Sequence, residues 1–169
     1  PMTVQKKVCV LGAFAVGKTS LVGRFVKNVF DERYLTTVGV KIDRKDVEAG
    51  DETVRMVLWD IQGEDELQPI RPSYMKGASG CLLVVDGTRP ETLDVARRLK
   101  VWGQANAGDI PFLMLLNKSD LTAEWALHDG DLQGDGRPGC RVIATSAKTG
   151  EGVEEAFRIL AEKMIHPAR

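Results

Sequence analysis

Residues 12–19, which read Gly-Ala-Phe-Ala-Val-Gly-Lys-Thr, constrain the fold more than any other part of the chain. They directly follow the apolar run Val8–Leu11. The spacing G-x-x-x-x-G-K-T between a buried strand and a helix is typical of a loop that wraps around a polyphosphate. Glycines let the backbone approach closely, and successive N–H groups form an anion nest at the positive end of the helix. The sequence therefore predicts a strand, a phosphate loop and a helix, and favours this over a plain glycine turn.

The side chains at the end of this loop have specific expected roles. Lys18 adds a point charge near the terminal phosphates, and the Thr19 hydroxyl is placed to bind Mg²⁺. The residues expected to contact the phosphates are Ala15, Val16, Gly17, Lys18, Thr19 and Ser20.

Length and composition are those of one domain, expected to span residues 1–169, since 43% of residues are hydrophobic and 28% charged. A net charge of -1 gives no electrostatic case for nucleic acid or an anionic membrane. No apolar run reaches membrane-spanning length, and no signal peptide opens the chain. Cys9, Cys81 and Cys140 are expected to be buried free thiols in a reducing, cytoplasmic compartment, and no cysteine or histidine spacing suggests zinc.

Strand-length and helix-length patterns alternate along the chain. Strands are expected at Lys7–Leu11, Val38–Glu48, Glu52–Asp60, Cys81–Val85, Phe112–Leu116 and Val142–Ala144. Helices are expected from Lys18 to about Asn28, from Pro90 to about Gln104, and at Gly152–Ile165. Continuous apolar strands separated by amphipathic helices predict an α/β fold, with a six-stranded, mostly parallel sheet between two helical layers.

Polar motifs follow four of the expected strands. They are the phosphate loop, Asp60–Gly63, Asn117–Asp120 and Thr145–Lys148. Ligands of parallel sheets bind beyond the carboxyl ends of the strands, so the four motifs should converge on one site.

Residues 129–139 are rich in glycine and are expected to form an exposed loop after a short helix that contains Trp125. Their aspartates partly resemble a calcium-binding loop. Gln133 and Cys140 break that pattern, because Cys140 stands where a bidentate glutamate is needed. The solvated loop is the favoured interpretation.

The four strand-end motifs, in this order, resemble those of the Ras superfamily of small GTP-binding proteins, nearest to its Rab and Rho branches. The resemblance covers Lys6 to about Ile165. It implies the three-layer fold of P-loop NTPases, with GTP or GDP as ligand and Mg²⁺ as cofactor.

The resemblance assigns the guanine base to two motifs. Asn117-Lys118-Ser119-Asp120 matches N-K-x-D, in which the Asp120 carboxylate would accept two hydrogen bonds that guanine offers and adenine does not. The Lys118 stem would lie along the base. Ser146-Ala147-Lys148 matches S-A-K, in which the Ala147 N–H would meet the guanine oxygen. By itself, Asn-Lys-Ser-Asp would suggest a polar turn.

The resemblance assigns the metal and the γ-phosphate to two switch segments. Asp60 of the D-x-x-G motif would reach Mg²⁺ through water, and the Gly63 N–H would contact the γ-phosphate. Thr37 would bind Mg²⁺ through its hydroxyl and the γ-phosphate through its N–H, with Thr36 as an adjacent rival. Phe30 would lie edge-on over the guanine. A polar linker is the alternative for this first segment.

Three residues depart from the family pattern. Glu64 stands where the family has a glutamine that orients the attacking water. An ionised glutamate only accepts hydrogen bonds and adds negative charge near the γ-phosphate, which predicts slow hydrolysis. Gln62 replaces a small residue and could supply the missing amide. Phe14 also replaces a small residue, and either obstructs an arginine supplied by an activating protein or packs over the switch region. Alternatively, Glu64 faces solvent and another group positions the water.

The predicted function is a GTP-binding molecular switch that slowly hydrolyses GTP. The residues expected at the reacting phosphate are Lys18, Thr37, Gly63 and Glu64, and the expected metal ligands are Thr19, Thr37 and, through water, Asp60. One alternative is a nucleotide-dependent binding module with negligible hydrolysis. Another is a small kinase, which would need an arginine-rich lid that the sequence does not suggest.

Partner proteins are implied by the resemblance alone. Effectors, an exchange factor and an activating protein would contact Phe30–Gly39 and Gln62–Lys76. Prenylated family members end in a cysteine-bearing tail, whereas residues near Arg169 include neither a cysteine nor a polybasic run. No membrane anchor is therefore expected in this chain. Either a tail is missing from it, or the protein is a soluble member, for which a prokaryotic relative would fit.

Overall fold

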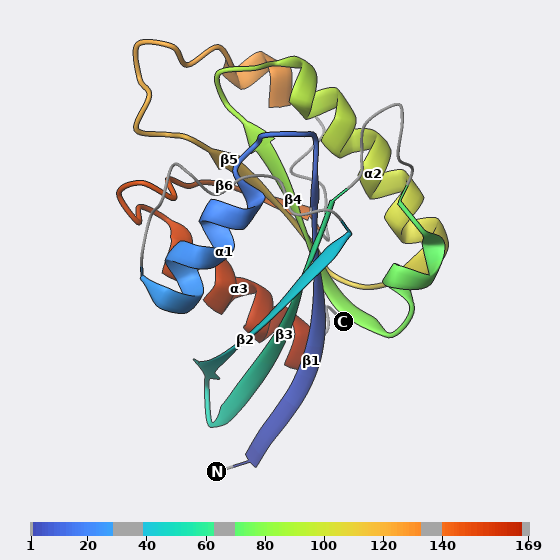
Figure 1. The fold of residues 1–169 in the computed structure, drawn as a ribbon. Coiled ribbons are helices and arrows are strands. Elements are labelled where there is room, and N and C mark those ends of the chain that lie inside the picture. The colour runs from blue at the N-terminus through green and yellow to red at the C-terminus, as the bar shows by residue number, and fades with distance from the viewer. Residues whose placement is uncertain (1, 29–38, 63–69, 133–139, 167–169) are drawn as a thin grey trace.

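The computed structural model describes residues 2–28, 39–62, 70–132 and 140–166, and contains a six-stranded sheet in the order β2-β3-β1-β4-β5-β6 (Figure 1). The strands are β1 (Met2–Gly12), β2 (Val40–Ala49), β3 (Glu52–Ile61), β4 (Ala78–Asp86), β5 (Phe112–Asn117) and β6 (Cys140–Ala144). Neighbouring strands are parallel except β2, which pairs antiparallel with β3. The predicted mostly parallel sheet is confirmed.

Helices cover both faces of this sheet. They are α1 (Lys18–Lys27), α2 (Glu91–Ala107) and α3 (Val153–Ile165), with short 3-10 helices η1 (Pro72–Met75) and η2 (Asp129–Leu132). Figure 1 shows α1 and α3 on one face of the sheet and α2 on the other. Within the described residues, no helix is long and apolar enough to cross a membrane.

Alternation along the central strand β1 divides the core between the two faces. Val8 and Val10 belong to the hydrophobic cluster under α1 and α3, whereas Cys9 and Leu11 belong to the cluster under α2. Successive side chains of a strand point to opposite faces, so a continuous apolar run supplies both clusters. This burial holds the carboxyl end of β1 in place, where the phosphate loop begins.

Helices α1 and α3 meet through two stacked aromatic rings. The ring centroids of Phe25 and Phe157 lie 3.7 Å apart, with an angle of 4° between the ring planes. Both side chains are almost completely buried. This contact ties the helix that follows the phosphate loop to the helix that follows β6.

The segment around Trp125 was predicted to be a short helix, and this prediction is wrong. Trp125 lies in irregular structure, and the next short helical turn, η2, begins at Asp129. The backbone of the segment is fixed by the Ala126 N–H, which donates to the Gly87 carbonyl at 2.8 Å. The indole covers Gly87 so closely that a Cβ there would lie 1.9 Å from the ring. Tertiary contacts with the β4–α2 loop therefore override local helical propensity.

The three cysteines are buried free thiols, as expected. Cys9 on β1 is in register with Cys81 on β4. Burial raises the pKa of the Cys9 thiol to about 11 and also raises the pKa of Cys81 well above its usual value. Both side chains therefore behave as small apolar groups of the core.

Phe157→Ala should destabilise the fold by about 4 kcal/mol, because the substitution leaves a cavity against Phe25 that the surrounding structure fills only partly. Urea denaturation followed by far-UV circular dichroism measures the change in the free energy of unfolding. Val101→Ala is the control, because Val101 lies on a helix and is 68% exposed. The control should change stability by less than about 0.5 kcal/mol. Equal effects of the two substitutions would contradict the role given to the aromatic contact.

Candidate nucleotide and magnesium site

Three of the four polar motifs meet at the buried side chain of Asn117, at the carboxyl end of β5. Its Nδ2 donates to the carbonyl of Val16 in the phosphate loop at 3.0 Å. Its Oδ1 accepts from the Thr145 hydroxyl and the Ala147 N–H, both at 3.3 Å. One amide thus joins the phosphate loop, the β5 end and the β6 end.

Asn117 was expected to contact nucleotide, and that role stays a prediction. In the structure, both ends of its amide are engaged by protein groups. The Ala147 N–H, expected at the guanine oxygen, likewise donates to Asn117. What the geometry shows is a positioning role, because the amide fixes two loops relative to the end of β5.

The expected guanine-binding carboxylate is held by the neighbouring motif. The Ser146 hydroxyl donates to Asp120 Oδ1 at 2.7 Å and accepts from the Thr149 N–H at 3.0 Å. Ser146 is fully buried, so it holds the carboxylate in a fixed orientation. The S-A-K motif thereby positions the side chain that is expected to distinguish guanine from adenine.

Arg24 on α1 anchors the S-A-K loop from the other side, a role that the sequence did not suggest. Its Nε donates to the Ala147 carbonyl at 2.7 Å, and its Nη2 donates to the carbonyl of Lys148. The Lys148 side chain itself is exposed. A surface arginine in a helix has no local pattern that marks such a contact.

The expected metal ligands Thr19 and Asp60 contact each other. The Thr19 hydroxyl donates to Asp60 Oδ2 at 2.6 Å, and Asp60 is fully buried. Burial raises the pKa of the Asp60 carboxyl, against the opposing effects of the Thr19 hydrogen bond and the Lys18 charge. A hydroxyl and a carboxylate are hard oxygen donors, which is the ligand type that Mg²⁺ prefers. The pair therefore fits this ion.

Gln62 lies against the same two groups. Its Nε2 donates to Asp60 Oδ1 at 2.9 Å and to the Thr19 hydroxyl at 3.4 Å. The suggestion that this amide reaches toward a phosphate stays a prediction, since here the amide binds the two expected metal ligands. A small residue at this position could not make these contacts.

Lys18 is a buried cation at the base of the phosphate loop. Its Nζ donates to the Gly12 carbonyl at 3.4 Å, and it is 5% exposed. Burial lowers the pKa of Lys18, while the Asp60 charge acts in the opposite direction. A buried ammonium is stabilised by an anion beside it, so the environment of Lys18 suits a phosphate group.

Other expected site residues are distributed as follows. Ser20 lies in the first turn of α1, directly after Thr19. Ala15 and Gly17 both adopt left-handed backbone conformations, with φ of 62° and 98°. Phe30, Thr37, Gly63 and Glu64 lie outside the described residues, as does Thr36.

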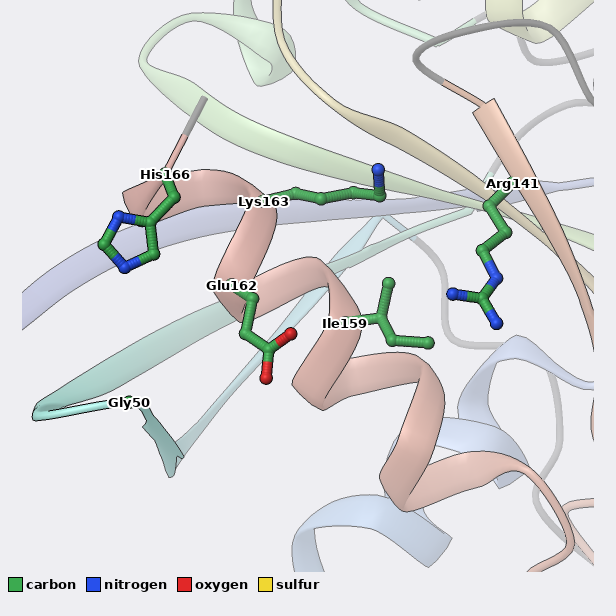
Figure 2. Close-up of a pocket in the computed structure, with 6 residues that line it drawn as sticks. All are labelled: Gly50, Arg141, Ile159, Glu162, Lys163 and His166. Atoms are coloured by element: carbon green, nitrogen blue, oxygen red, sulfur yellow. The ribbon is translucent and has the colours of Figure 1, made fainter. Parts of the chain in front are cut away.

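A groove at the amino ends of the parallel strands, opposite the ends that carry the motifs, contains none of the expected site residues. Figure 2 shows its lining, which is Gly50, Arg141, Ile159, Glu162, Lys163 and His166. Arg141 lies near the start of β6, and Gly50 lies in the turn before β3, so both mark the amino ends of parallel strands. The groove is therefore separate from the strand ends that carry the motifs.

Comparison with known proteins identifies the family. The model of the Ras family matches residues 7–166. The chain belongs to the Ras family. Ras-related protein Rab-7L1 of Rattus norvegicus is 35% identical, over 96% of this chain and 83% of its own length. The Homo sapiens protein of that name is 36% identical, over 94% and 82%. Ras-related protein Rab7 of Drosophila melanogaster is 32% identical, over 94% and 80%.

Membership of the Ras family confirms the predicted fold and the predicted GTP-binding switch class, with GTPase activity in general terms. Nucleotide binding and contacts with regulators and effectors belong to the same family-level description. Family membership does not by itself assign a role to each residue. This chain differs from the family pattern at Phe14, Gln62 and Glu64.

Asp86 is a buried charged residue of the site that the sequence analysis missed. It ends β4, and its Oδ2 lies 2.8 Å from Lys118 Nζ. Lys118 Nζ in turn donates to the Ala15 carbonyl of the phosphate loop at 3.1 Å. The rule that polar residues follow apolar strands could have found Asp86, since it directly follows Cys81–Val85.

Two opposing effects act on the pKa of Asp86. Burial alone would raise the pKa of its carboxyl, but hydrogen bonds from Lys118 and Thr88 outweigh burial and lower it. A carboxyl whose pKa is lower in the folded than in the unfolded state stabilises the fold at pH values above its unfolded pKa. This stabilisation is lost as the pH falls through the folded pKa.

Asp86→Asn should therefore lower the free energy of unfolding by about 2 kcal/mol at pH 7, because Lys118 loses its buried partner. The difference from wild type should stay constant down to about pH 5 and narrow below about pH 4. Urea unfolding between pH 3 and pH 7 measures it. Asp109→Asn removes an exposed carboxylate and is the matched control. A difference that grows as the pH falls would contradict the assignment.

Proposed function

We propose that this Ras-family protein binds GTP and GDP together with Mg²⁺ at the strand ends described above and hydrolyses GTP slowly. The observation that carries the proposal is the buried Lys18 beside the contact between Thr19 and Asp60. The buried ammonium of Lys18, which an anion would stabilise, lies next to two hard oxygen donors, the Thr19 hydroxyl and the Asp60 carboxylate. This combination suits a magnesium-bound polyphosphate.

In this proposal, the residues around the phosphates act by positioning and by neutralising charge. Lys18 and the N–H groups of the phosphate loop bind phosphate oxygens, and Thr19 and Thr37 hold the metal, with Asp60 acting through water. Mg²⁺ supplies charge neutralisation at the phosphates. The Gly63 N–H binds the γ-phosphate, so loss of that phosphate releases both switch segments. No side chain is assigned as general base.

Asp120 and Ser146 support the choice of guanine. Asp120 is held by the Ser146 hydroxyl at 2.7 Å, which leaves a carboxylate preset for one hydrogen-bonding pattern. A site built to bind donor groups of a base rejects a base that lacks them, because its own acceptors then stay unpaired. The remaining face of the base is assigned to Phe30 and to the stem of Lys118.

Partner proteins are proposed at the two switch segments, Phe30–Gly39 and Gln62–Lys76. They comprise effectors, an exchange factor and an activating protein. Phe14 supports a second candidate function, a nucleotide-dependent binding module with negligible hydrolysis. Phe14, in the phosphate loop, is 56% exposed, so its side chain is free to obstruct an arginine that an activating protein would insert toward the phosphates.

Isothermal titration calorimetry with Mg²⁺ tests the nucleotide choice. The wild type should bind GDP at least about a hundredfold more tightly than ADP. Asp120→Ala should remove most of that preference by weakening GDP binding, while ADP binding stays unchanged. Ser119→Ala alters the variable position of the same motif and should keep the wild-type preference. Equal affinity of the wild type for GDP and ADP would contradict the proposed function.

Single-turnover hydrolysis of GTP tests the role of Glu64. Glu64→Gln should hydrolyse GTP about tenfold faster, because an amide can both accept from and donate to the attacking water and removes a negative charge near the γ-phosphate. Glu66→Gln removes the same charge two residues away and should keep the wild-type rate. An unchanged or slower Glu64→Gln variant would show that another group positions the water. Hydrolysis absent from both proteins would favour the binding module.

A further inference from the structure

The phosphate loop holds an alanine in a backbone conformation that disfavours L-residues. Ala15 has φ of 62°, in the left-handed region that glycine enters without steric cost. Such a conformation persists where surrounding contacts fix it. The question is which contacts fix Ala15.

Two cations fix the peptide groups on either side of the Ala15 Cα. Arg89 Nη1 donates to the Phe14 carbonyl at 2.9 Å, and Lys118 Nζ donates to the Ala15 carbonyl at 3.1 Å. Each carbonyl is therefore turned toward a side chain from outside the loop. Since these two peptide planes set φ and ψ of Ala15, the two cations hold its left-handed conformation.

The same contacts determine where two N–H groups point. In a trans peptide, the N–H is directed opposite to the C=O of the same plane. With its carbonyls drawn outward by Arg89 and Lys118, the loop turns the N–H groups of Ala15 and Val16 the other way. Successive N–H groups on one side of a turn form the anion nest expected of this loop.

The Arg89 side chain, which contacts the phosphate loop, also faces the buried carboxylate of Asp86. Asp86 Oδ2 lies 3.7 Å from Arg89 Nη1 and 2.8 Å from Lys118 Nζ, so one buried carboxylate faces both cations. Its Oδ1 is occupied by Thr88, whose N–H and hydroxyl donate to it at 2.8 and 2.6 Å.

The backbone around Arg89 is fixed by a buried threonine. The Thr92 hydroxyl donates to the Arg89 carbonyl at 2.7 Å and accepts from the Asp86 N–H at 2.9 Å. Thr92 is fully buried at the start of α2. These hydrogen bonds fix the backbone of the β4–α2 loop at the residue from which the guanidinium extends.

We propose that Arg89 is a positioning residue for the phosphate loop, which holds the Phe14–Ala15 peptide so that the Ala15 N–H faces the polyphosphate. Arg89 acts through the loop and makes no contact with the reacting atoms. The inference rests on the proposed binding of GTP and GDP. It implies that this chain uses Arg89 to maintain a conformation that a glycine would adopt unaided.

A double-mutant cycle in GDP affinity tests the inference, with calorimetry or a fluorescent GDP analogue as readout. Arg89→Ala should raise the Kd for GDP about tenfold, since it removes a charge-assisted hydrogen bond from a strained peptide. Ala15→Gly should bind GDP at least as tightly as the wild type. In the Ala15→Gly background, Arg89→Ala should cost only about threefold, because glycine needs less external support.

The coupling separates positioning from a purely structural role. If Arg89 only stabilised the fold, its removal would change GDP affinity equally in both backgrounds, or leave it unchanged, and either result would overturn the inference. Arg89→Lys keeps the charge facing Asp86 with a shorter donor and should show an intermediate loss. If Arg89→Ala does not fold, the GDP affinity of Arg89→Lys is compared in the wild-type and Ala15→Gly backgrounds instead.

Glu91→Gln is the matched control. Arg89 Nε lies 3.4 Å from Glu91 Oε1, and among the described residues this exposed pair is a second ionic contact of Arg89 besides Asp86. Its loss should leave GDP affinity at the wild-type value. If the wild type binds GDP and the Arg89→Ala variant binds it with the same affinity, the positioning role is refuted and the proposed function stands. A wild type without nucleotide affinity would refute the proposed function and this inference together.

Discussion

The buried amide of Asn117 is the interaction on which the geometry of the site depends. It donates to the phosphate loop through Val16 and accepts from the β6 end through Thr145 and Ala147. A buried amide with both ends paired rigidifies the groups around it, whereas loss of one partner leaves a costly unsatisfied group. The phosphate loop and the loop proposed to bind the base thus share one anchor. A shift of the phosphate loop would therefore disturb the loop after β6, and the reverse, because both are bonded to Asn117.

The sequence allowed the sheet and the convergence of the polar motifs to be predicted, because both follow from one rule. Apolar strands end at a common edge, and polar residues directly after them must lie there. That rule placed Asp60 and the motifs beginning at Asn117 and Thr145. It would have placed Asp86 too, had the end of β4 been treated like the ends of the other strands.

The parts that could not be predicted depend on contacts between distant segments. Arg24 binds the carbonyl of Ala147, far along the chain, and no periodicity marks a half-buried helical arginine for that contact. Trp125 was expected in a helix, but its indole covers Gly87 instead. Gln62 was expected to supply an amide near the phosphate, but its amide donates to the expected metal ligands Asp60 and Thr19. Local propensity carries no information about such partners.

The three buried cysteines can report how often the sheet opens, through the rate at which their thiols are alkylated. Alkylating reagents attack the thiolate, and Cys9 and Cys81 are buried with raised pKa values, so the sheet must open before they react. The rate of labelling under native conditions therefore counts opening events. Any ligand that bridges the strand ends slows those events by mass action. Protection of the thiols would report binding without any dye or radioactive nucleotide.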